Sequence, residues 1–275
     1  GFIAVEMAHI FDGLGSRVTI VHRGDQLLRG TDDDIRRRLT ATYTERMDVQ
    51  LNTSIERAEF LNGAHRLIFS DGSTIEGDQL LVATGRIPNA DLADVAAGGI
   101  GVNEHGYVIT DERLRTTAEK VWALGDVTNP VQLKHTANDE ARLVARQLID
   151  DADHTTIDRR FVPHAIFGHP QIASVGPTEA ELLAAARPYV VAVRDYSETA
   201  YGWAMEDESG FAKVLADPET RELLGAHIIG PQAPTLVQLL VQGMAAGLTV
   251  DDMARNQLWI HPAMPELVEQ ALLAL

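Results

Sequence analysis

The sequence predicts an α/β fold that is followed, toward the C-terminus, by a separate α+β domain. Within residues 1–88, segments with helical periodicity alternate with short strands rich in β-branched residues. Within residues 158–275, strand-like segments come first and helical segments follow them. A chain of 275 residues is long enough for more than one domain. We therefore expect three parts, residues 1–88, 89–157 and 158–275.

The first part is expected to hold two helices around a strand. The run "FIAVEMAHIFDGLG" has helical periodicity and ends in Gly15, a residue type favoured at helix C-termini. The strand "RVTIVHR" follows, and "DDDIRRRLTATYTERM" then predicts a second helix whose first acids are stabilised by the helix dipole. From Val49 to Gly85, turns at "NG" and "DG" separate short strands, and "LLVAT" is apolar on both faces, as in a buried strand.

The remaining two parts are predicted from the same periodicities. In the middle part, "VWALGD" reads as a buried strand that ends at Asp126, and a helix is expected from Leu133 to Leu148. In the last part, strands are expected near "AIFG", "YVVAVRDY", "FAKVLAD" and "LLGAHIIG". Helices are expected near residues 234–247, 249–255 and 264–274.

Composition excludes several classes of protein. A hydrophobic content of 45% and a charged content of 23% are typical of a globular chain. No apolar run approaches the roughly 18–20 residues of a bilayer-spanning helix, and no signal peptide is evident, so we expect no membrane association. The net charge of −17 argues against nucleic-acid binding. The lack of cysteine excludes thiol chemistry within these residues and fits a cytoplasmic location.

The start of the chain resembles the second half of a Rossmann-type phosphate loop. Gly1, Ala4 and Ala8 fit the end of a G-x-G-x-x-A-x-x-x-A pattern, in which small residues let a pyrophosphate approach the N-terminus of a helix. The first glycine of the pattern and its strand are not in this chain. The alternative reading is that these small residues only allow close packing.

The end of the next strand favours one nicotinamide cofactor over the other. A site for NADH places an acid near this point, to accept hydrogen bonds from the ribose. Here the strand ends with His22, and Arg23 and Arg29 follow. Guanidinium groups bind a 2′-phosphate, which a carboxylate would repel, so the pattern favours NADPH. The alternative is that both arginines are solvated surface charges.

A second pair of segments, about forty residues apart, suggests a further nucleotide site. "ATGRIPN" places Gly85 in a tight turn, and "VWALGD" places Asp126 just after a glycine. A carboxylate there can hold the hydroxyls of a sugar or ribitol chain, and the following helix would point its N-terminal amides toward the same ligand. Each segment alone is also compatible with a simple turn.

Five stretches together resemble the flavin-dependent pyridine nucleotide–disulfide oxidoreductases, the family of glutathione reductase and lipoamide dehydrogenase. They are "GFIAVE", "ATGRIPN", "VWALGD", "VPHAIFGHPQIASVGPTEAE" and "HPAMPE". The resemblance extends over essentially the whole chain. Within the family, "LKHTANDEAR", "AYGWAMED" and "QLWIHPAMPE" are most similar to the branch that reduces mycothione, the disulfide of mycothiol.

The resemblance implies FAD and NADPH as cofactors, a homodimer, and mycothione as a small-molecule disulfide substrate. It assigns residues 1–88 to an NADPH-binding domain, residues 89–157 to the second part of an FAD-binding domain, and residues 158–275 to a dimerisation domain. Family members also carry the front of the FAD domain and a C-x-x-x-x-C redox pair. The chain is therefore expected to be truncated relative to the family and inactive alone.

The resemblance also implies roles for individual residues. Phe2 would cover the flavin face where the nicotinamide docks, and Glu6 would lie near the nicotinamide. Gly1, Ala4, Arg23 and Arg29 would contact NADPH. The FAD contacts would be Gly85, Asp126, and the backbone amides near His135 and Thr136.

The C-terminal motif "HPAMPE" would carry the proton chemistry of this family. A departing thiolate is a better leaving group when a His protonates it, and a carboxylate bonded to the other ring nitrogen fixes the tautomer of that His. His261 is thus the expected general acid/base and Glu266 its orienting partner, working in the active site of the other subunit. Pro262 would hold the turn through a cis bond. Taken alone, the residues also fit a surface His at a helix start.

Two other functions stay open. One is a dihydrolipoamide dehydrogenase or another flavin disulfide reductase, although Arg23 and Arg29 disfavour an NAD-dependent enzyme. The other is a non-catalytic, nucleotide-binding dimerisation module. Trp203 and Met205 are expected in interface packing. No metal site is expected, since His164 and His169 lie five apart on a strand and face opposite sides.

Overall fold

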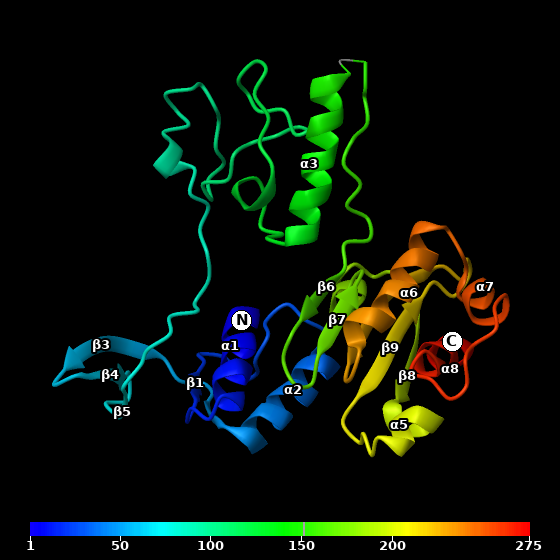
Figure 1. Cartoon of the computed structure of the whole chain (residues 1–275), viewed down its shortest axis with the longest axis horizontal. Coiled ribbons are helices and arrows are strands. Elements are labelled where there is room, and N and C mark those ends of the chain that lie inside the picture. Colours follow the sequence, from blue (N-terminus) through cyan, green and yellow to red (C-terminus); the bar gives the residue numbers. More distant parts are fainter. Residues whose placement is uncertain (151) are drawn as a thin grey trace. The chain divides into compact units, whose positions relative to one another are not determined.

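The computed structural model describes residues 1–150 and 152–275. These residues form two compact units, one made of residues 1–84 and 163–275 and the other of residues 85–162 (Figure 1). Within residues 1–150 and 152–275, no helix is both long enough and apolar enough to cross a bilayer.

The first unit begins with a small α/β layer. Helix α1 (Phe2–Gly13) and helix α2 (Asp33–Arg46) accompany strand β1 (Thr19–Val21), which pairs in parallel with β2 (Asp48–Gln50). Gly15 has a φ of 91°, and the N–H groups of Gly15 and Ser16 donate to the carbonyls of Asp12 and Phe11. This arrangement ends α1 as the sequence predicts.

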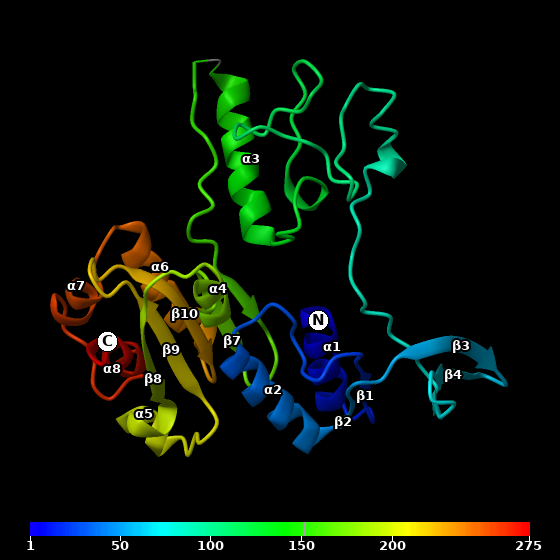
Figure 2. The same ribbon diagram turned by 180° about the vertical axis from the view of Figure 1, so that it is seen from behind.

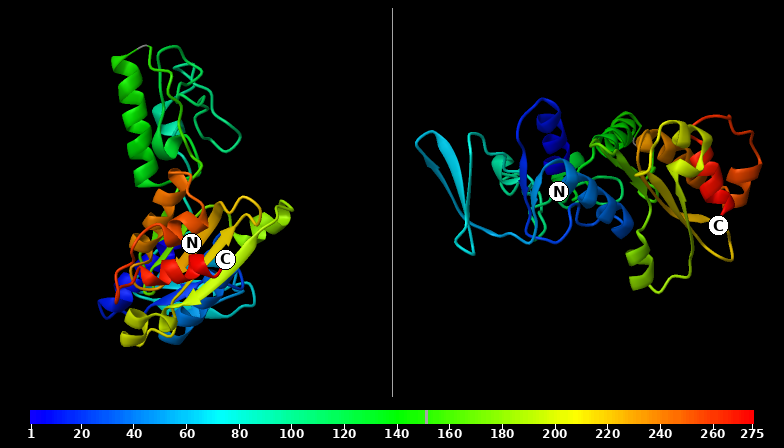
Figure 3. Two further views of the ribbon diagram at one scale, coloured as in Figure 1. Left: turned by 90° about the vertical axis from the view of Figure 1, so that its right-hand side faces the viewer. Right: turned by 90° about the horizontal axis from the view of Figure 1, so that it is seen from below.

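A three-stranded antiparallel sheet follows, made of β3 (Ile55–Leu61), β4 (Ala64–Phe69) and β5 (Thr74–Gly77) (Figure 3). The turn between β3 and β4 is formed by Asn62 and Gly63, with φ values of 55° and 83°. Both residues are therefore left-handed, as a two-residue hairpin turn requires. The predicted strands and the "NG" turn are confirmed here.

The predicted buried strand "LLVAT" is wrong. Residues 80–84 form no strand, and Leu81 and Val82 are 54% and 70% exposed. The parallel sheet of the described chain contains only β1 and β2, so no neighbouring strand offers hydrogen bonds or an apolar face to this segment. An apolar run becomes a buried strand only where such neighbours exist.

The C-terminal part of the first unit is built on a five-stranded antiparallel sheet (Figure 2). Its strand order is β6-β7-β10-β9-β8. The strands are β6 (His164–Ile166), β7 (Ile172–Val175), β8 (Val190–Asp195), β9 (Phe211–Ala216) and β10 (Leu223–Ile229). Four of them confirm the predicted strands, and β7 is an addition. Every residue of β7, β9 and β10 is buried, so both faces of the central strands are covered.

Five helices belong to this part. Helices α6 (Ala233–Ala245), α7 (Val250–Arg255) and α8 (Glu266–Leu273) lie where the sequence predicts helices. Two short helices, α4 (Glu179–Ala184) and α5 (Ala200–Ala204), are additions. Helix α6 packs on β7 and β10, and α8 packs on β8 and β9.

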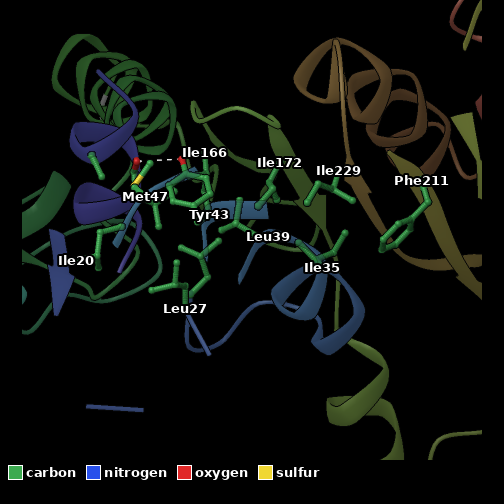
Figure 4. Close-up of a cluster of buried hydrophobic side chains, with 13 residues drawn as sticks. Ile20, Leu27, Ile35, Leu39, Tyr43, Met47, Ile166, Ile172, Phe211 and Ile229 are labelled. Carbon is green, nitrogen blue, oxygen red and sulfur yellow. Dashed lines mark hydrogen bonds between the residues drawn. The ribbon is translucent and has the colours of Figure 1, made fainter. Parts of the chain in front are cut away.

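One hydrophobic core joins the N-terminal layer to this sheet (Figure 4). Ile35, Leu39 and Tyr43 of α2 pack with strand residues that include Ile172 and Ile229. The Tyr43 hydroxyl donates to the Val5 carbonyl at 3.1 Å, and burial raises the pKa of Tyr43 to about 12. Residues 1–84 and the C-terminal sheet are thus held by shared apolar burial.

The second unit contains α3 (Lys134–Ile149) and two short 3₁₀ turns, η1 (Asp91–Ala93) and η2 (Gly125–Val127). Leu114, Leu143 and Val144 form its small core. The helix confirms the prediction for residues 133–148. The strand predicted in "VWALGD" is wrong, because this segment pairs only by a single bridge between Arg115 and Trp122 and then turns into η2.

Candidate functional site

His261 and Glu266 are brought together at the start of α8. The Nδ1 atom of His261 lies 2.7 Å from Oε1 of Glu266, and the N–H of Ala263 donates to Oε2 at 3.0 Å. The His261–Pro262 peptide bond is cis, as expected. Glu266 is the first residue of α8, where the helix dipole also favours a carboxylate.

The two side chains differ sharply in exposure. The His261 side chain is 69% exposed, whereas that of Glu266 is 11% exposed. Burial raises the pKa of Glu266, but the hydrogen bonds from His261 and Ala263 outweigh burial, so the pKa lies below its usual value. An ionised carboxylate can only accept, so Nδ1 carries the proton toward Glu266. The Nε2 atom has no hydrogen-bond partner among the residues that the structure describes, and it can exchange a proton with a ligand.

The N-terminus of α1 carries the small residues of the predicted phosphate loop. Gly1 is the N-cap residue, no side chain caps the helix, and the first turn contains no acid. A helix N-terminus without acidic side chains in its first turn favours an anion through the helix dipole. Phe2 is 40% exposed on this turn. Ala4 is partly buried, and Ala8 is buried at 5% exposure within the core.

Glu6 is placed by a long-range contact. Its Oε1 atom accepts the N–H of Phe167 at 2.9 Å, so the side chain links α1 to the chain just after β6. The carboxylate retains a second oxygen for a further donor.

Arg23 and Arg29 lie in the loop between β1 and α2, and both are exposed. Neither forms an ion pair or a hydrogen bond with any part of the chain that the structure describes. The loop itself is ordered by backbone bonds, since Asn52 N–H donates to Gly24 O and Thr53 N–H donates to His22 O. Two guanidiniums without an ion-pair partner in the described residues fit a nucleotide with a 2′-phosphate.

Burial lowers the pKa of His22, and the charges of Arg23 and Arg36 act in the same direction. The imidazole is therefore neutral at pH 7, where an acid would stand in a site for NADH.

The second unit gathers another set of polar groups around η2. Asp126 has a side chain that is 54% exposed, and its Oδ2 lies 3.8 Å from Nη1 of Arg86. Gly85, next to Arg86, has a φ of 133°, which only glycine adopts readily.

At the N-terminus of α3, no side chain caps the helix, and the Thr136 hydroxyl donates to Leu133 O. His135 lies beside Thr136 in the first turn and is exposed. An exposed carboxylate and uncapped helix amides fit the hydroxyls and the ring carbonyls of a flavin nucleotide.

Sequence reasoning missed two buried charged groups that support these sites. Glu140, with a side chain 1% exposed, accepts from the Gly125 N–H and from Arg159, both at 2.6 Å. Lys213, 2% exposed, pairs with Asp32 and Asp34, at the end of the loop that carries Arg23 and Arg29. The signal for Lys213 was a single charge inside the apolar run "FAKVLAD".

Trp203 and Met205 lie at α5 and are 74% and 45% exposed, which leaves their expected interface role a prediction. Within residues 1–150 and 152–275, no three or more His, Cys, Asp or Glu side chains cluster as a metal site would need.

Two family matches divide the chain. Residues 1–141 match the pyridine nucleotide-disulphide oxidoreductase family, and residues 162–272 match its dimerisation domain. Mycothione reductase of Mycobacterium tuberculosis is 48% identical over the whole chain, which covers 61% of that protein. Glutathione reductase of Burkholderia cepacia is 32% identical over 97% of this chain and 59% of its own length. The chain thus spans about three fifths of the length of these relatives.

A solved structure agrees with these matches. The Cu(II) complex of the HOCl-induced flavoprotein disulfide reductase RclA from Escherichia coli has a TM-score of 0.90 at 30% identity. It covers 99% of this chain, and this chain covers 62% of it. The expected fold, an α/β nucleotide-binding portion before an α+β dimerisation domain, is confirmed. The chain belongs to the pyridine nucleotide-disulphide oxidoreductase family, whose members use FAD and NAD(P)H.

Proposed function

We propose that the protein containing this chain reduces a small disulfide, mycothione, with electrons from NADPH. The observation that carries the proposal is the exposed imidazole of His261, held by the buried carboxylate of Glu266 at 2.7 Å. An oriented His with one free nitrogen is what the protonation of a departing thiolate needs. The identity of 48% to a mycothione reductase, against 32% to a glutathione reductase, supports mycothione among the candidate disulfides.

The three predicted parts have separate tasks in this proposal. Residues 1–88 bind NADPH, residues 89–157 hold part of FAD, and residues 158–275 form the dimer. Arg23 and Arg29 bind the 2′-phosphate through charge-assisted hydrogen bonds, while Gly1 and Ala4 let the pyrophosphate reach the amides of α1. Phe2 stacks near the nicotinamide, and Glu6 orients it.

In the second unit, Asp126 would hold the ribitol hydroxyls, Gly85 would allow close approach of the backbone, and the amides of His135 and Thr136 would face the flavin ring. When bound, FAD passes electrons from the nicotinamide to a disulfide. The chain has no cysteine, so we propose that a redox-active pair outside these residues receives them and that the 275-residue chain alone does not turn over.

The role of His261 is acid–base. As thiol–disulfide exchange releases a thiolate, the Nε2–H of a protonated His261 gives it a proton, while Glu266 keeps Nδ1–H in place. We propose that this His261 serves the active site of the other subunit of a homodimer, which its exposure within one chain supports.

The test is a comparison of coenzymes and disulfides with the intact flavoprotein. We expect the kcat/KM for mycothione to exceed that for glutathione disulfide and for lipoamide, and NADPH to be preferred to NADH. A preference for lipoamide with NADH would contradict the proposal. Replacement of Arg29 by Ala should weaken the binding of NADPH and leave the binding of NADH nearly unchanged, because NADH lacks the 2′-phosphate.

A further inference from the structure

Lys213 is the centre of a buried charge cluster that the proposed chemistry does not use. It lies on β9 and is 2% exposed. Its Nζ atom lies 3.1 and 3.0 Å from the two carboxylate oxygens of Asp32, 2.5 Å from Asp34, and 2.7 Å from Glu179. The ammonium thus joins the sheet of the C-terminal part to the start of α2 and to α4.

Burying such a cluster carries a large desolvation penalty. An ammonium and a carboxylate lose their hydration when they are buried, and apolar side chains of similar volume often give equal or higher stability. Asp32 is as buried as Lys213, at 1% exposure. What an ion pair adds, beyond burial, is a fixed position for the carboxylate. The question is therefore what the position of Asp32 controls.

Asp32 closes the loop that carries Arg29. Its Oδ1 atom accepts the N–H of Asp34 at 3.0 Å, so Asp32 is the N-cap of α2. Glu179 N–H also reaches the Oδ2 atom of Asp32 at 3.4 Å. The position of Asp32 therefore sets where α2 begins and where the loop before it ends.

The backbone on either side of Arg29 is constrained. Leu28 and Gly30 both have positive φ values, 58° and 88°. A left-handed Leu is unfavourable unless its surroundings hold it there. The side chains of Leu27 and Leu28 are both buried at 2% exposure, and Leu27 N–H donates to Thr40 Oγ1 at 3.0 Å. Arg29 thus projects to the surface from a loop fixed at its base.

We propose that Lys213 is a positioning residue for coenzyme recognition: by pinning Asp32, it fixes the loop so that Arg29 meets the 2′-phosphate of NADPH. This inference rests on the proposed NADPH site. It predicts that Lys213, which does not touch the coenzyme, contributes to the discrimination of a 2′-phosphate more than to the binding of the rest of the nucleotide.

The experiment measures the binding of 2′,5′-ADP and of 5′-AMP to the intact flavoprotein by isothermal titration calorimetry. The two probes differ only in the 2′-phosphate. In the Lys213→Met variant, we expect the affinity for 2′,5′-ADP to fall about tenfold and that for 5′-AMP to change less than about twofold, because misplacing one guanidinium removes directed hydrogen bonds to a single group.

A second variant separates positioning from folding. Lys213→Met leaves Asp32 buried without a cation, which destabilises the fold. The double variant Asp32→Asn/Lys213→Met removes the two fully buried charges, and the Asn side chain can still accept from the N–H of Asp34. The carboxylates of Asp34 and Glu179 remain, but they are 36% and 31% exposed and keep contact with solvent. We expect its melting temperature to recover toward the wild-type value while the loss of 2′,5′-ADP affinity persists. Arg221→Met, which breaks the 2.8 Å ion pair with Asp251, is the control for a lost ion pair away from the loop. We expect the ratio of its affinities for 2′,5′-ADP and 5′-AMP to be unchanged.

Each alternative outcome overturns the inference. An unchanged ratio of the two affinities in both Lys213 variants would leave Lys213 a stabilising residue only. Full recovery of 2′,5′-ADP affinity in the double variant would assign the loss to an unpaired carboxylate. The Arg29→Ala variant distinguishes the proposals, since an unchanged 2′,5′-ADP preference there would contradict the NADPH site itself.

Discussion

The Nδ1 atom of His261 lies 2.7 Å from Oε1 of Glu266, and the other oxygen of Glu266 is taken by the Ala263 N–H. Both carboxylate oxygens therefore have donors, and the depressed pKa of Glu266 keeps the group ionised. The consequence is a single ring orientation, with one tautomer and an exposed Nε2. This arrangement predicts that the carboxylate acts through the imidazole and only in the steps that move a proton.

Replacing Glu266 by Gln should slow the reaction with disulfide far more than the reaction with NADPH. The amide can still bond to the ring but no longer stabilises the imidazolium, so we expect turnover to fall roughly 10- to 100-fold. Stopped-flow absorbance of the flavin separates the two half-reactions. Glu269→Gln, on the same helix and without a bond to His261, is the matched control. Equal slowing of both half-reactions by Glu266→Gln would contradict the assigned role.

The pairing of His261 with Glu266 could be predicted because the two residues are close in the sequence. Five positions separate His261 from Glu266, and Pro262 and the start of α8 fix the turn between them. The same holds for the Asn62–Gly63 hairpin and for the C-terminal cap of α1 at Gly15, where a short pattern determines the geometry. Their functional consequences in the site remain predictions.

The features that sequence reasoning missed depend on distant parts of the chain. Lys213 and Asp32 are 181 positions apart, and no pattern near either residue names its partner. The segment "LLVAT" has the composition of a buried strand, but burial requires a neighbouring strand that the described sheet does not supply. The strand predicted in "VWALGD" is absent for the same reason, because the backbone there pairs only through a single bridge at Trp122.

The charge cluster around Lys213 also predicts how the folding stability depends on pH. The hydrogen bond from Lys213 lowers the pKa of Glu179, and for Asp34 the bonds from Lys213 and Arg37 outweigh burial, so that pKa is also lowered. Their unfolded values are about 4, so this stabilisation is complete above that pH and is lost as pH falls through the lower folded values.

Between about pH 5 and pH 3, the melting temperature should therefore fall more steeply in the wild type than in Lys213→Met. Circular dichroism melts over a pH series measure both slopes, with Lys134→Met as the control for loss of an exposed lysine. Parallel slopes in the wild type and in Lys213→Met would show that these carboxylates do not titrate against Lys213.

Glu140 should be the main polar support of the turn that carries Asp126. Glu140→Ala leaves the Gly125 N–H and Arg159 without their acceptor, and we expect a loss of about 2–3 kcal/mol, limited because the Arg159 side chain is 41% exposed. Denaturant unfolding measures the loss, and hydrogen exchange at Gly125 locates it. Asp139→Ala, beside it on α3 but in an exposed pair with Arg142, should stay within about 0.5 kcal/mol. Equal effects of the two substitutions would contradict a special role of Glu140.

The segment just before His261 should be part of the dimer interface. Leu258 and Ile260 are 99% and 73% exposed in the single chain, an unfavourable exposure for two aliphatic side chains so close together. Since we propose that His261 serves the partner's active site, contacts here would both hold the subunits together and aim the imidazole. Leu258→Asp should then yield monomers in size-exclusion chromatography with light scattering.

If His261 serves the partner's active site, a monomer should lose only the reaction with disulfide. A monomeric Leu258→Asp variant should still accept electrons from NADPH, because the residues that we propose to bind the two nucleotides all lie in one chain. Its reaction with disulfide should fall as it does when His261 is replaced by Ala. Leu183→Asp, at a leucine of α4 that is 63% exposed, is the control and should stay dimeric and active. A monomer that reduces disulfide at the wild-type rate would contradict a role of His261 in the partner's active site.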